Sequence, residues 1–208
     1  IPYLLLHTYI HEAVHRTGVN TLEKKGALQK PKRLQSGLID IKGQHGWVLG
    51  EAVTEHLANV ITDEFFKRSG QLYNFTPAER KKLSFFTETS SYGEERKELF
   101  NFVTLAASKL EVPEELLWQA LTRQYFTGEI PLDEFHNAIL DIAGIGETLD
   151  KEASGEHVSE DEMTLVRTAI SLANSPMRQD DGRPGQGLPI ATAQINRTNA
   201  ARGLKTNQ

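Results

Sequence analysis

The stretch LLLHTYIHEAVHRTG, near the start of the chain, carries three histidines at intervals of four residues. Two of them, His11 and His15, combine with Glu12 to form the pattern H-E-x-x-H. On a helix this spacing puts both imidazoles on one face, with Cβ atoms about 6 Å apart, so that both rings can bind one zinc ion. The intervening glutamate can then deprotonate a water molecule at the metal. The pattern predicts a zinc site with His11 and His15 as ligands and Glu12 as general base.

The remaining histidine of the stretch, His7, does not fit the same ion. A helix rises about 1.5 Å per residue, so His7 and His15 are separated by about 12 Å along the axis. Bonds from zinc to nitrogen are only about 2.1 Å long, and a straight helix cannot direct three successive turns at one ion. We expect His7 beside the ligands or at the rim of the site. A partly exposed histidine without a role is an equally good interpretation.

A third ligand must come from another part of the chain. Histidine at position 21 would extend the pattern to H-E-x-x-H-x-x-G-x-x-H, but that residue is Thr21. The segment GEAVTEHLAN offers Glu51 and Glu55, which are four residues apart and share a helix face. Either carboxylate could complete a His, His, Glu set with an open position for water. His56 and Asn59 follow closely and are candidates for positions beside the ligands, whereas a solvated helix face is the other interpretation.

Helical spacing predicts the elements that must carry these residues. Residues 3–16 contain no Gly or Pro and are followed by Gly18, so they predict a first helix. Residues 47–68 carry apolar side chains at helical spacing and predict a second, long helix. Between the two helices, the partial alternation in residues 36–44 predicts a short strand or hairpin arm.

The second half of the chain predicts helices throughout. Thr76, Pro77 and Glu79 resemble a capped helix start. Four further segments carry an apolar stripe, namely residues 93–110, 113–126, 132–144 and 159–174. From residue 175 onward the chain is rich in Gly, Pro, Asn, Gln and Arg, which predicts a flexible tail.

The expected fold is therefore mainly α-helical, with at most a small β element. We expect residues 1–70 to form a metal-binding core, residues 71–174 to form a helical subdomain packed on it, and residues 175–208 to form the tail. With 208 residues, the chain is long enough for one domain with an appendage.

Composition narrows the chemistry further. The net charge of −5 and the isoelectric point of about 5.8 give no basic face for nucleic acid. The chain has no cysteine, so any metal must be held by His, Asp or Glu. No apolar run approaches the roughly 18 residues of a membrane span, and the opening IPYLLL lacks a cleavage-site pattern. We expect the natural N-terminus to lie upstream of Ile1; the compartment, cytoplasmic or extracellular, depends on that missing part.

The motif HEAVHRTG, followed downstream by GEAVTEHLA, resembles the gluzincins, in which a glutamate on the next helix is the third zinc ligand. The longer segment SGLIDIKGQHGWVLGEAVTEHLA is similar to the small bacterial proteins called minigluzincins. The resemblance covers residues 4–66 and implies a zincin-like core, in which Zn²⁺ is bound by His11, His15 and Glu55. Glu51 remains the competing ligand. The resemblance also implies hydrolysis of a peptide or protein substrate, with Glu12 as general base.

Two positions near the implied ligand differ from the common gluzincin pattern. Asn59 stands where an acidic residue often orients a histidine ligand, and its amide can still accept a hydrogen bond from an imidazole N–H. His56 stands where an aromatic residue such as tyrosine is common. We expect both side chains beside the ligands.

Hydrolysis of an amide also requires a donor that stabilises the charge on the carbonyl oxygen. Candidates are Tyr92, His45 and His56. The segment SYGEERKELFNFVTLAASKL resembles a helix that follows the zinc site in minigluzincin-like proteins, which favours Tyr92. Each of the three, taken singly, is also explained by packing. We expect His136 and His157 to be structural or exposed.

The alternative hypothesis is a helical protein-interaction domain with a structural or vestigial zinc site and no peptidase activity. A fourth metal position filled by His7, Glu51 or another side chain would favour it. A third possibility is a zymogen-like state in which the tail covers the zinc ion.

Overall fold

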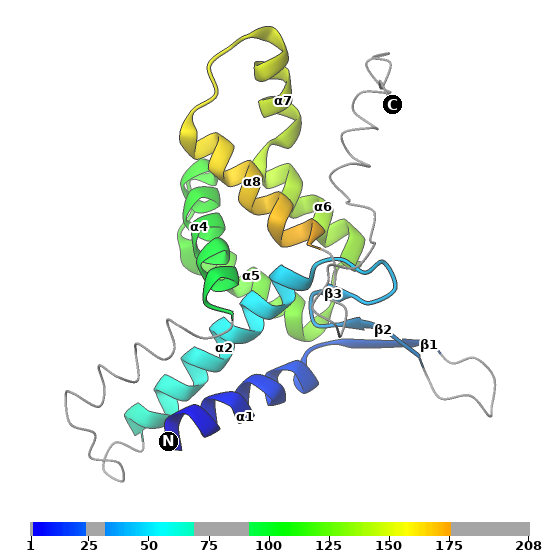
Figure 1. Ribbon diagram of the computed structural model, residues 1–208, viewed down its shortest axis with the longest axis vertical. Coiled ribbons are helices and arrows are strands. Elements are labelled where there is room, and N and C mark those ends of the chain that lie inside the picture. Colours follow the sequence, from blue (N-terminus) through cyan, green and yellow to red (C-terminus); the bar gives the residue numbers. More distant parts are fainter. Residues whose placement is uncertain (1, 24–31, 69–91, 176–208) are drawn as a thin grey trace.

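The computed structural model describes residues 2–23, 32–68 and 92–175. Within these residues the fold is mainly α-helical, as predicted (Figure 1). The elements in chain order are α1 (Pro2–Thr17), β1 (Asn20–Glu23), β2 (Lys32–Ser36), β3 (Ile39–Asp40), α2 (Trp47–Arg68), α4 (Gly93–Leu110), α5 (Glu114–Thr127), α6 (Leu132–Ala143), α7 (Ile145–Ser154) and α8 (Glu160–Asn174).

Helix α1 packs along α2, and α2 in turn packs against α4 and α8 (Figure 1). We call helices α4 to α8 the bundle. One apolar core runs from α2 into the bundle, and its side chains include Val53, Leu99, Leu121, Leu140 and Leu172. The buried apolar residues of each helix face this core, whereas Val60, Ile61 and Phe65 of the apolar stripe predicted for α2 are exposed. The bundle therefore supports the side of α2 that does not face α1.

A small antiparallel sheet of order β1-β2-β3 follows α1. The pairs Gln35↔Asp40 and Ser36↔Ile39 define a tight hairpin between β2 and β3. Gly37 occupies its turn with a φ of 56°, in the left-handed region that favours glycine. The sequence predicted a strand only near residues 36–44, so the sheet is larger than expected. The missed strands β1 and β2 lie in polar segments without a clear alternation of apolar residues.

Helix boundaries agree closely with the predicted ranges, with one exception. Helix α7 lies between two predicted helices, in residues 145–158, for which the sequence predicted no element. Gly144 ends α6 in a left-handed conformation, with a φ of 73°, but a new helix begins immediately after it. The predicted helix start at Thr76 and the predicted tail after Ser175 lie outside the described residues.

Ser175, at the end of α8, fixes the start of α2. Its Oγ accepts a hydrogen bond of 2.7 Å from the backbone N–H of Val48, and its carbonyl accepts one of 3.4 Å from the N–H of Trp47. The first N–H groups of a helix have no partner within the helix, so a side-chain acceptor stabilises the helix end. A residue of the bundle thus holds the helix that carries Glu51 and Glu55.

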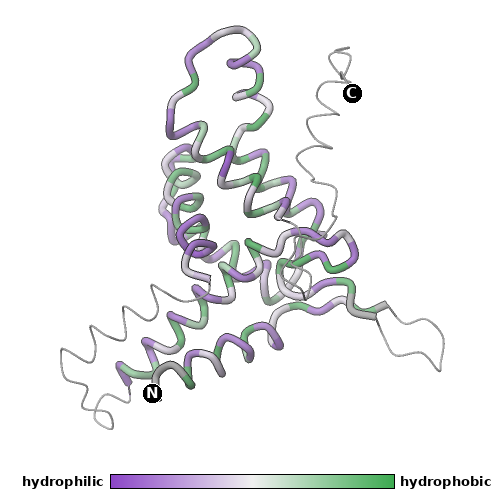
Figure 2. Tube along the Cα trace, in the orientation of Figure 1, coloured by the Kyte–Doolittle hydropathy of each residue, from purple (hydrophilic) through white to green (hydrophobic). Residues whose placement is uncertain are grey.

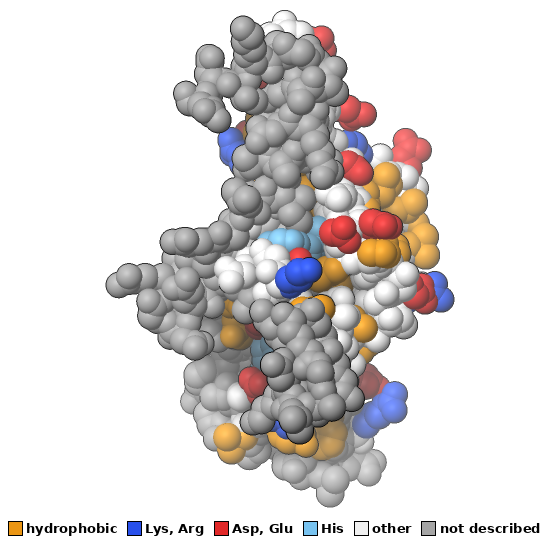
Figure 3. Space-filling model, turned by 90° about the vertical axis from the view of Figure 1, so that its right-hand side faces the viewer, with side chains coloured by type: hydrophobic (Ala, Val, Ile, Leu, Met, Phe, Trp, Pro, Cys, Tyr) orange, Lys and Arg blue, Asp and Glu red, His pale blue; other side chains and the backbone are white. Residues whose placement is uncertain are grey.

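Hydrophilic and hydrophobic positions alternate along the helices (Figure 2). No described helix combines the length and the apolar composition that a membrane crossing would require. On the face shown in Figure 3, acidic and basic side chains are interspersed with hydrophobic ones and with histidine. The described surface in this view therefore carries charges of both signs.

Candidate metal centre

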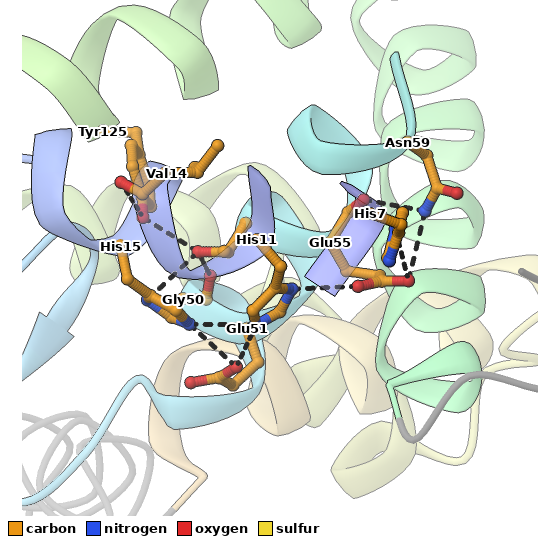
Figure 4. Close-up of polar contacts among 10 residues, drawn as sticks. His7, His11, Val14, His15, Gly50, Glu51, Glu55, Asn59 and Tyr125 are labelled. Atoms are coloured by element: carbon orange, nitrogen blue, oxygen red, sulfur yellow. Dashed lines mark hydrogen bonds and ion pairs between the residues drawn. The ribbon is translucent and has the colours of Figure 1, made fainter. Parts of the chain in front are cut away.

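Two helices supply the side chains of the candidate metal centre. His7, His11 and His15 lie on α1, and Glu51 and Glu55 lie on α2 (Figure 4). Each set recurs every four residues and so occupies one helix face. Contacts run in opposite directions along the two helices, since His15 meets Glu51 and His7 meets Glu55. The helices are therefore antiparallel, and their polar faces match turn by turn; we call these five residues the polar interface.

The polar interface is buried. His11 and Glu51 are each 6% exposed, and Glu55 is only 1% exposed. Burial of a carboxylate is costly unless the group is paired or binds a cation. The interpretation of Glu51 and Glu55 as a solvated helix face is therefore wrong.

Three ligand atoms in the polar interface form a nearly regular triangle. The Nε2 atoms of His11 and His15 are 3.2 Å apart. Oε2 of Glu51 lies 3.2 Å from Nε2 of His15 and 3.6 Å from Nε2 of His11. Bonds of about 2.1 Å around a tetrahedral zinc ion place ligand atoms about 3.4 Å apart. The triangle matches one face of that tetrahedron, so His11, His15 and Glu51 could hold a metal ion.

The structure groups Glu51, and not Glu55, with the two histidines, whereas the sequence favoured Glu55 as the third ligand. Glu55 lies one turn further along α2. Its Oε2 is 3.0 Å from Nδ1 of His11, and its Oε1 is 3.4 Å from Nε2 of His7. A carboxylate beside Nδ1 keeps a proton on that nitrogen and leaves the lone pair of Nε2 for a metal. Glu55 thus contacts His11 at the ring nitrogen that does not belong to the triangle.

Asn59 and His7 both contact Glu55. The Nδ2 group of Asn59 donates to Oε1 of Glu55 at 3.2 Å and to its carbonyl oxygen at 2.8 Å. The sequence suggested instead that Asn59 accepts from an imidazole. His7 is 6% exposed and contacts the Glu55 oxygen that faces away from His11. We call His11, His15 and Glu51 the ligand group. His7 and Asn59 therefore lie beside the ligand group, and both contact Glu55.

His15 is held by hydroxyl groups. Its Nδ1 faces Oγ1 of Thr54 at 3.5 Å, and Oγ1 of Thr54 is 2.8 Å from the hydroxyl of Tyr125 on α5. Sequence reasoning missed both residues. Thr54 stands between the two glutamates in the sequence, which could have drawn attention to it, whereas no pattern connects Tyr125 with the motif.

In the metal-free site, the pKa values of His11 and Glu51 depend on each other. Burial acts to lower the pKa of His11, but the carboxylates of Glu51 and Glu55 outweigh burial and raise that pKa to about 9. Burial acts to raise the pKa of Glu51, but hydrogen bonds from His11 and His15 outweigh it and lower that pKa to about 2. A proton on His11 therefore compensates the buried carboxylates when no metal is bound, and a cation must displace it.

Tyr92 is the predicted donor that lies against the ligand group. Its ring stacks on the ring of His11, with centroids 5.1 Å apart and an interplanar angle of 9°. The ring of Trp47 lies 5.9 Å from that of Tyr92.

Glu12, the predicted general base, is exposed on α1. Its side chain is therefore accessible to solvent.

The other two predicted donors have different neighbours. Nε2 of His45 is 3.0 Å from Oδ2 of Asp40, and its ring contacts the ring of His136 at 5.1 Å. His56 stacks on Trp118 with centroids 4.0 Å apart. His136 is fully buried and faces the carbonyl of Leu38, which agrees with a structural role, and His157 is exposed.

The ligand group thus offers two imidazole nitrogens and one carboxylate oxygen, a set that suits divalent cations such as zinc. Comparisons with family models, with curated proteins and with solved structures found no match for this chain. The case for a function therefore rests on the geometry of the site and on the motif that builds it.

Proposed function

We propose that the protein is a zinc-dependent hydrolase that cleaves peptide bonds. The observation that carries the proposal is the triangle formed by His11, His15 and Glu51, whose edges of 3.2, 3.2 and 3.6 Å match one face of a zinc tetrahedron. Three protein ligands leave a fourth position open, which is typical of catalytic zinc sites and not of closed structural ones. The H-E-x-x-H motif adds a glutamate at the position where such hydrolases carry their base.

Each residue has a distinct part in this proposal. A bound zinc ion would supply Lewis-acid chemistry and lower the pKa of water. Glu12 would accept a proton from the attacking water and pass it to the leaving amine, since it is adjacent to a ligand and exposed to solvent. Tyr92, stacked on His11, would donate a hydrogen bond to the carbonyl oxygen as negative charge develops there.

An alternative is a helical protein-interaction domain in which the zinc is structural or vestigial. One observation favours it: an apolar groove of about 620 Å³ between α2 and α5, lined among others by His56, Val60, Trp118 and Phe126. Val60 and Phe126 are 51% and 39% exposed. Exposed apolar surface of this kind often binds a partner. The groove lies on a different face of α2 from Glu51 and is compatible with both functions.

Metal analysis and a peptidase assay test the proposal together. The purified chain should contain about one zinc ion per molecule, and His11→Ala and His15→Ala should contain none. Glu12→Gln should keep the zinc ion and lose the cleavage of a mixed library of fluorogenic peptides. Zinc content that is equal in wild type and both histidine variants would overturn the metal site. Zinc binding without any Glu12-dependent cleavage would favour the interaction domain.

The two glutamates provide a matched pair for the same measurement. Glu51→Gln should abolish tight zinc binding, because it removes a ligand charge. Glu55→Gln should weaken binding by about 10-fold to 100-fold, as expected for a residue that orients a ligand. The opposite order would restore Glu55 as the third ligand.

A further inference from the structure

A chain of hydroxyl groups connects the candidate metal centre with α5. Oγ1 of Thr54 lies 3.5 Å from Nδ1 of His15, 2.8 Å from the carbonyl oxygen of Gly50 and 2.8 Å from the hydroxyl of Tyr125. The Tyr125 hydroxyl also donates to the carbonyl oxygen of Val14 at 3.2 Å. Thr54 is fully buried and Tyr125 is 1% exposed, so no bulk water competes for these contacts.

The number of hydroxyl protons determines which group donates and which accepts along this series of hydrogen bonds. Thr54 has one hydroxyl proton, and both of its 2.8 Å partners are better acceptors by distance than Nδ1 of His15 at 3.5 Å. Whichever of those partners takes the proton, Thr54 presents a lone pair to His15. Nδ1 of His15 must then carry its own proton in order to donate, and Nε2, the nitrogen beside Glu51, is the one that can offer a lone pair to a metal ion.

Tyr125 supplies the rigid end of the chain. A Cβ atom added to Gly18 would lie 2.7 Å from its ring, and one added to Gly37 would lie 2.5 Å from it, so two glycine backbones fit closely around the ring. Burial raises the pKa of the Tyr125 hydroxyl to about 12, which keeps that hydroxyl a donor at neutral pH. The position of the hydroxyl is therefore fixed by the packing of α5 against α1 and the hairpin.

From these contacts we propose that Thr54 and Tyr125 are positioning residues for the metal ligand His15, and that they fix its tautomer and its ring orientation. The inference rests on the proposed metal site and adds a second orienting device to it. The carboxylate of Glu55 acts on Nδ1 of His11, and a neutral hydroxyl chain acts on Nδ1 of His15. Partners of this kind generally tune how tightly a metal is held.

Four variants of the full chain test the inference. Thr54→Val removes the hydroxyl and keeps the shape, whereas Thr54→Ser keeps the hydroxyl. Tyr125→Phe removes only the far hydroxyl and retains the ring between the glycines. Thr62→Val is the matched control, because Thr62 is also a fully buried threonine of α2 and makes no contact with the ligand group among the described residues.

Zinc affinity is measured by competition with a chromophoric chelator, and ligand geometry by the visible absorption of the Co²⁺-loaded protein. Thr54→Val should weaken zinc binding by about 10-fold to 100-fold and alter the cobalt spectrum. Tyr125→Phe should do the same by a smaller factor. Thr54→Ser and Thr62→Val should match the wild type in both measurements, a rescue that a purely structural role would not give.

The outcomes separate this inference from the proposed function. A wild-type chain that binds neither Zn²⁺ nor Co²⁺ would remove the metal site itself. A wild-type chain that binds zinc, together with unchanged affinity and spectrum in Thr54→Val and Tyr125→Phe, would overturn the positioning role alone. If Thr54→Val does not fold, Tyr125→Phe gives the same comparison. An effect of Thr62→Val as large as that of Tyr125→Phe would also refute the inference.

Discussion

The polar interface between α1 and α2 and the apolar core of the bundle are buried to a similar extent but hold together differently. In the interface, His11, Glu51 and Glu55 are at most 6% exposed and contact one another through charged or polar atoms. In the bundle, Leu140 and Leu172 are fully buried among other apolar side chains. Apolar burial stabilises by area and shape, whereas buried charge is tolerated only with a partner. The interface is thus held together by paired polar and charged groups, and the bundle by apolar packing.

Two of the buried histidines, His11 and His136, show the same difference within one residue type. His11 faces two carboxylates, which overcome burial and raise its pKa to about 9. His136, in α6, faces the carbonyl of Leu38; burial, followed by the charge of His45, lowers its pKa to about 4. One histidine is therefore stable as a cation and the other as a neutral ring.

The largest expected effect comes from the core of the bundle. Leu172→Ala should lower the free energy of unfolding by about 2–5 kcal/mol, because it leaves a cavity where α8 packs. The loss should be the same with and without zinc, since this side chain belongs to the apolar core and not to the ligand group. Urea unfolding in the presence of zinc or of a chelator measures both values.

Leu116→Ala on α5 is the control for this truncation, because Leu116 is 52% exposed. It should change the free energy of unfolding by less than about 0.5 kcal/mol. If Leu172→Ala abolished the additional stability given by zinc while the chain stayed folded, the separation between packing and metal binding would be wrong.

The pH dependence of the metal-free chain should show both histidines with opposite signs. The folded pKa of His11 lies above its ordinary value of 6.5, so its contribution is complete below pH 6.5 and is lost as the pH rises toward 9. The folded pKa of His136 lies below 6.5, so its contribution is present above pH 6.5 and is lost as the pH falls toward 4. Each shift corresponds to about 3 kcal/mol at most.

Urea unfolding of the chelator-treated protein at pH 5, 6.5 and 9 measures these contributions. His11→Gln should remove the loss of stability above pH 6.5 and keep the loss below it, and His136→Gln should do the reverse. A flat profile between pH 6.5 and 9 in the wild type would contradict the coupling of His11 to its carboxylates. With zinc bound, the alkaline loss should disappear, because the cation replaces the proton.

The sequence predicted the helices well, whereas its choice of a third ligand stays a prediction. Helical spacing is local, so the boundaries of α1, α2 and α4 followed from it closely. The choice between Glu51 and Glu55 is not local, because both lie on the same face of α2. The axial offset between two antiparallel helices decides which of them meets both imidazoles. Tyr125 could not be predicted for the same reason, since only the packing of α5 brings its hydroxyl to Thr54.

The smallest expected effects come from two serines that cap helices. Ser159 caps α8 from within the bundle, where its hydroxyl accepts from the N–H of Glu162. Ser175 caps α2, the helix that carries Glu51. Replacing either serine with alanine should cost about 1 kcal/mol of unfolding free energy. Only Ser175→Ala should also weaken zinc binding, because only it loosens the start of a ligand-bearing helix.

Urea unfolding and chelator competition on the two alanine variants measure this difference, and each variant is the control for the other. Equal losses of stability with a change in zinc affinity confined to Ser175→Ala would show that the bundle supports the site through the start of α2. If Ser159→Ala weakened zinc binding as much as Ser175→Ala, the site would respond to global stability alone. The distinction matters because Ser175 directly follows α8 of the bundle in the sequence. Its hydroxyl nevertheless holds Val48, at the first turn of α2, and so acts on the polar interface.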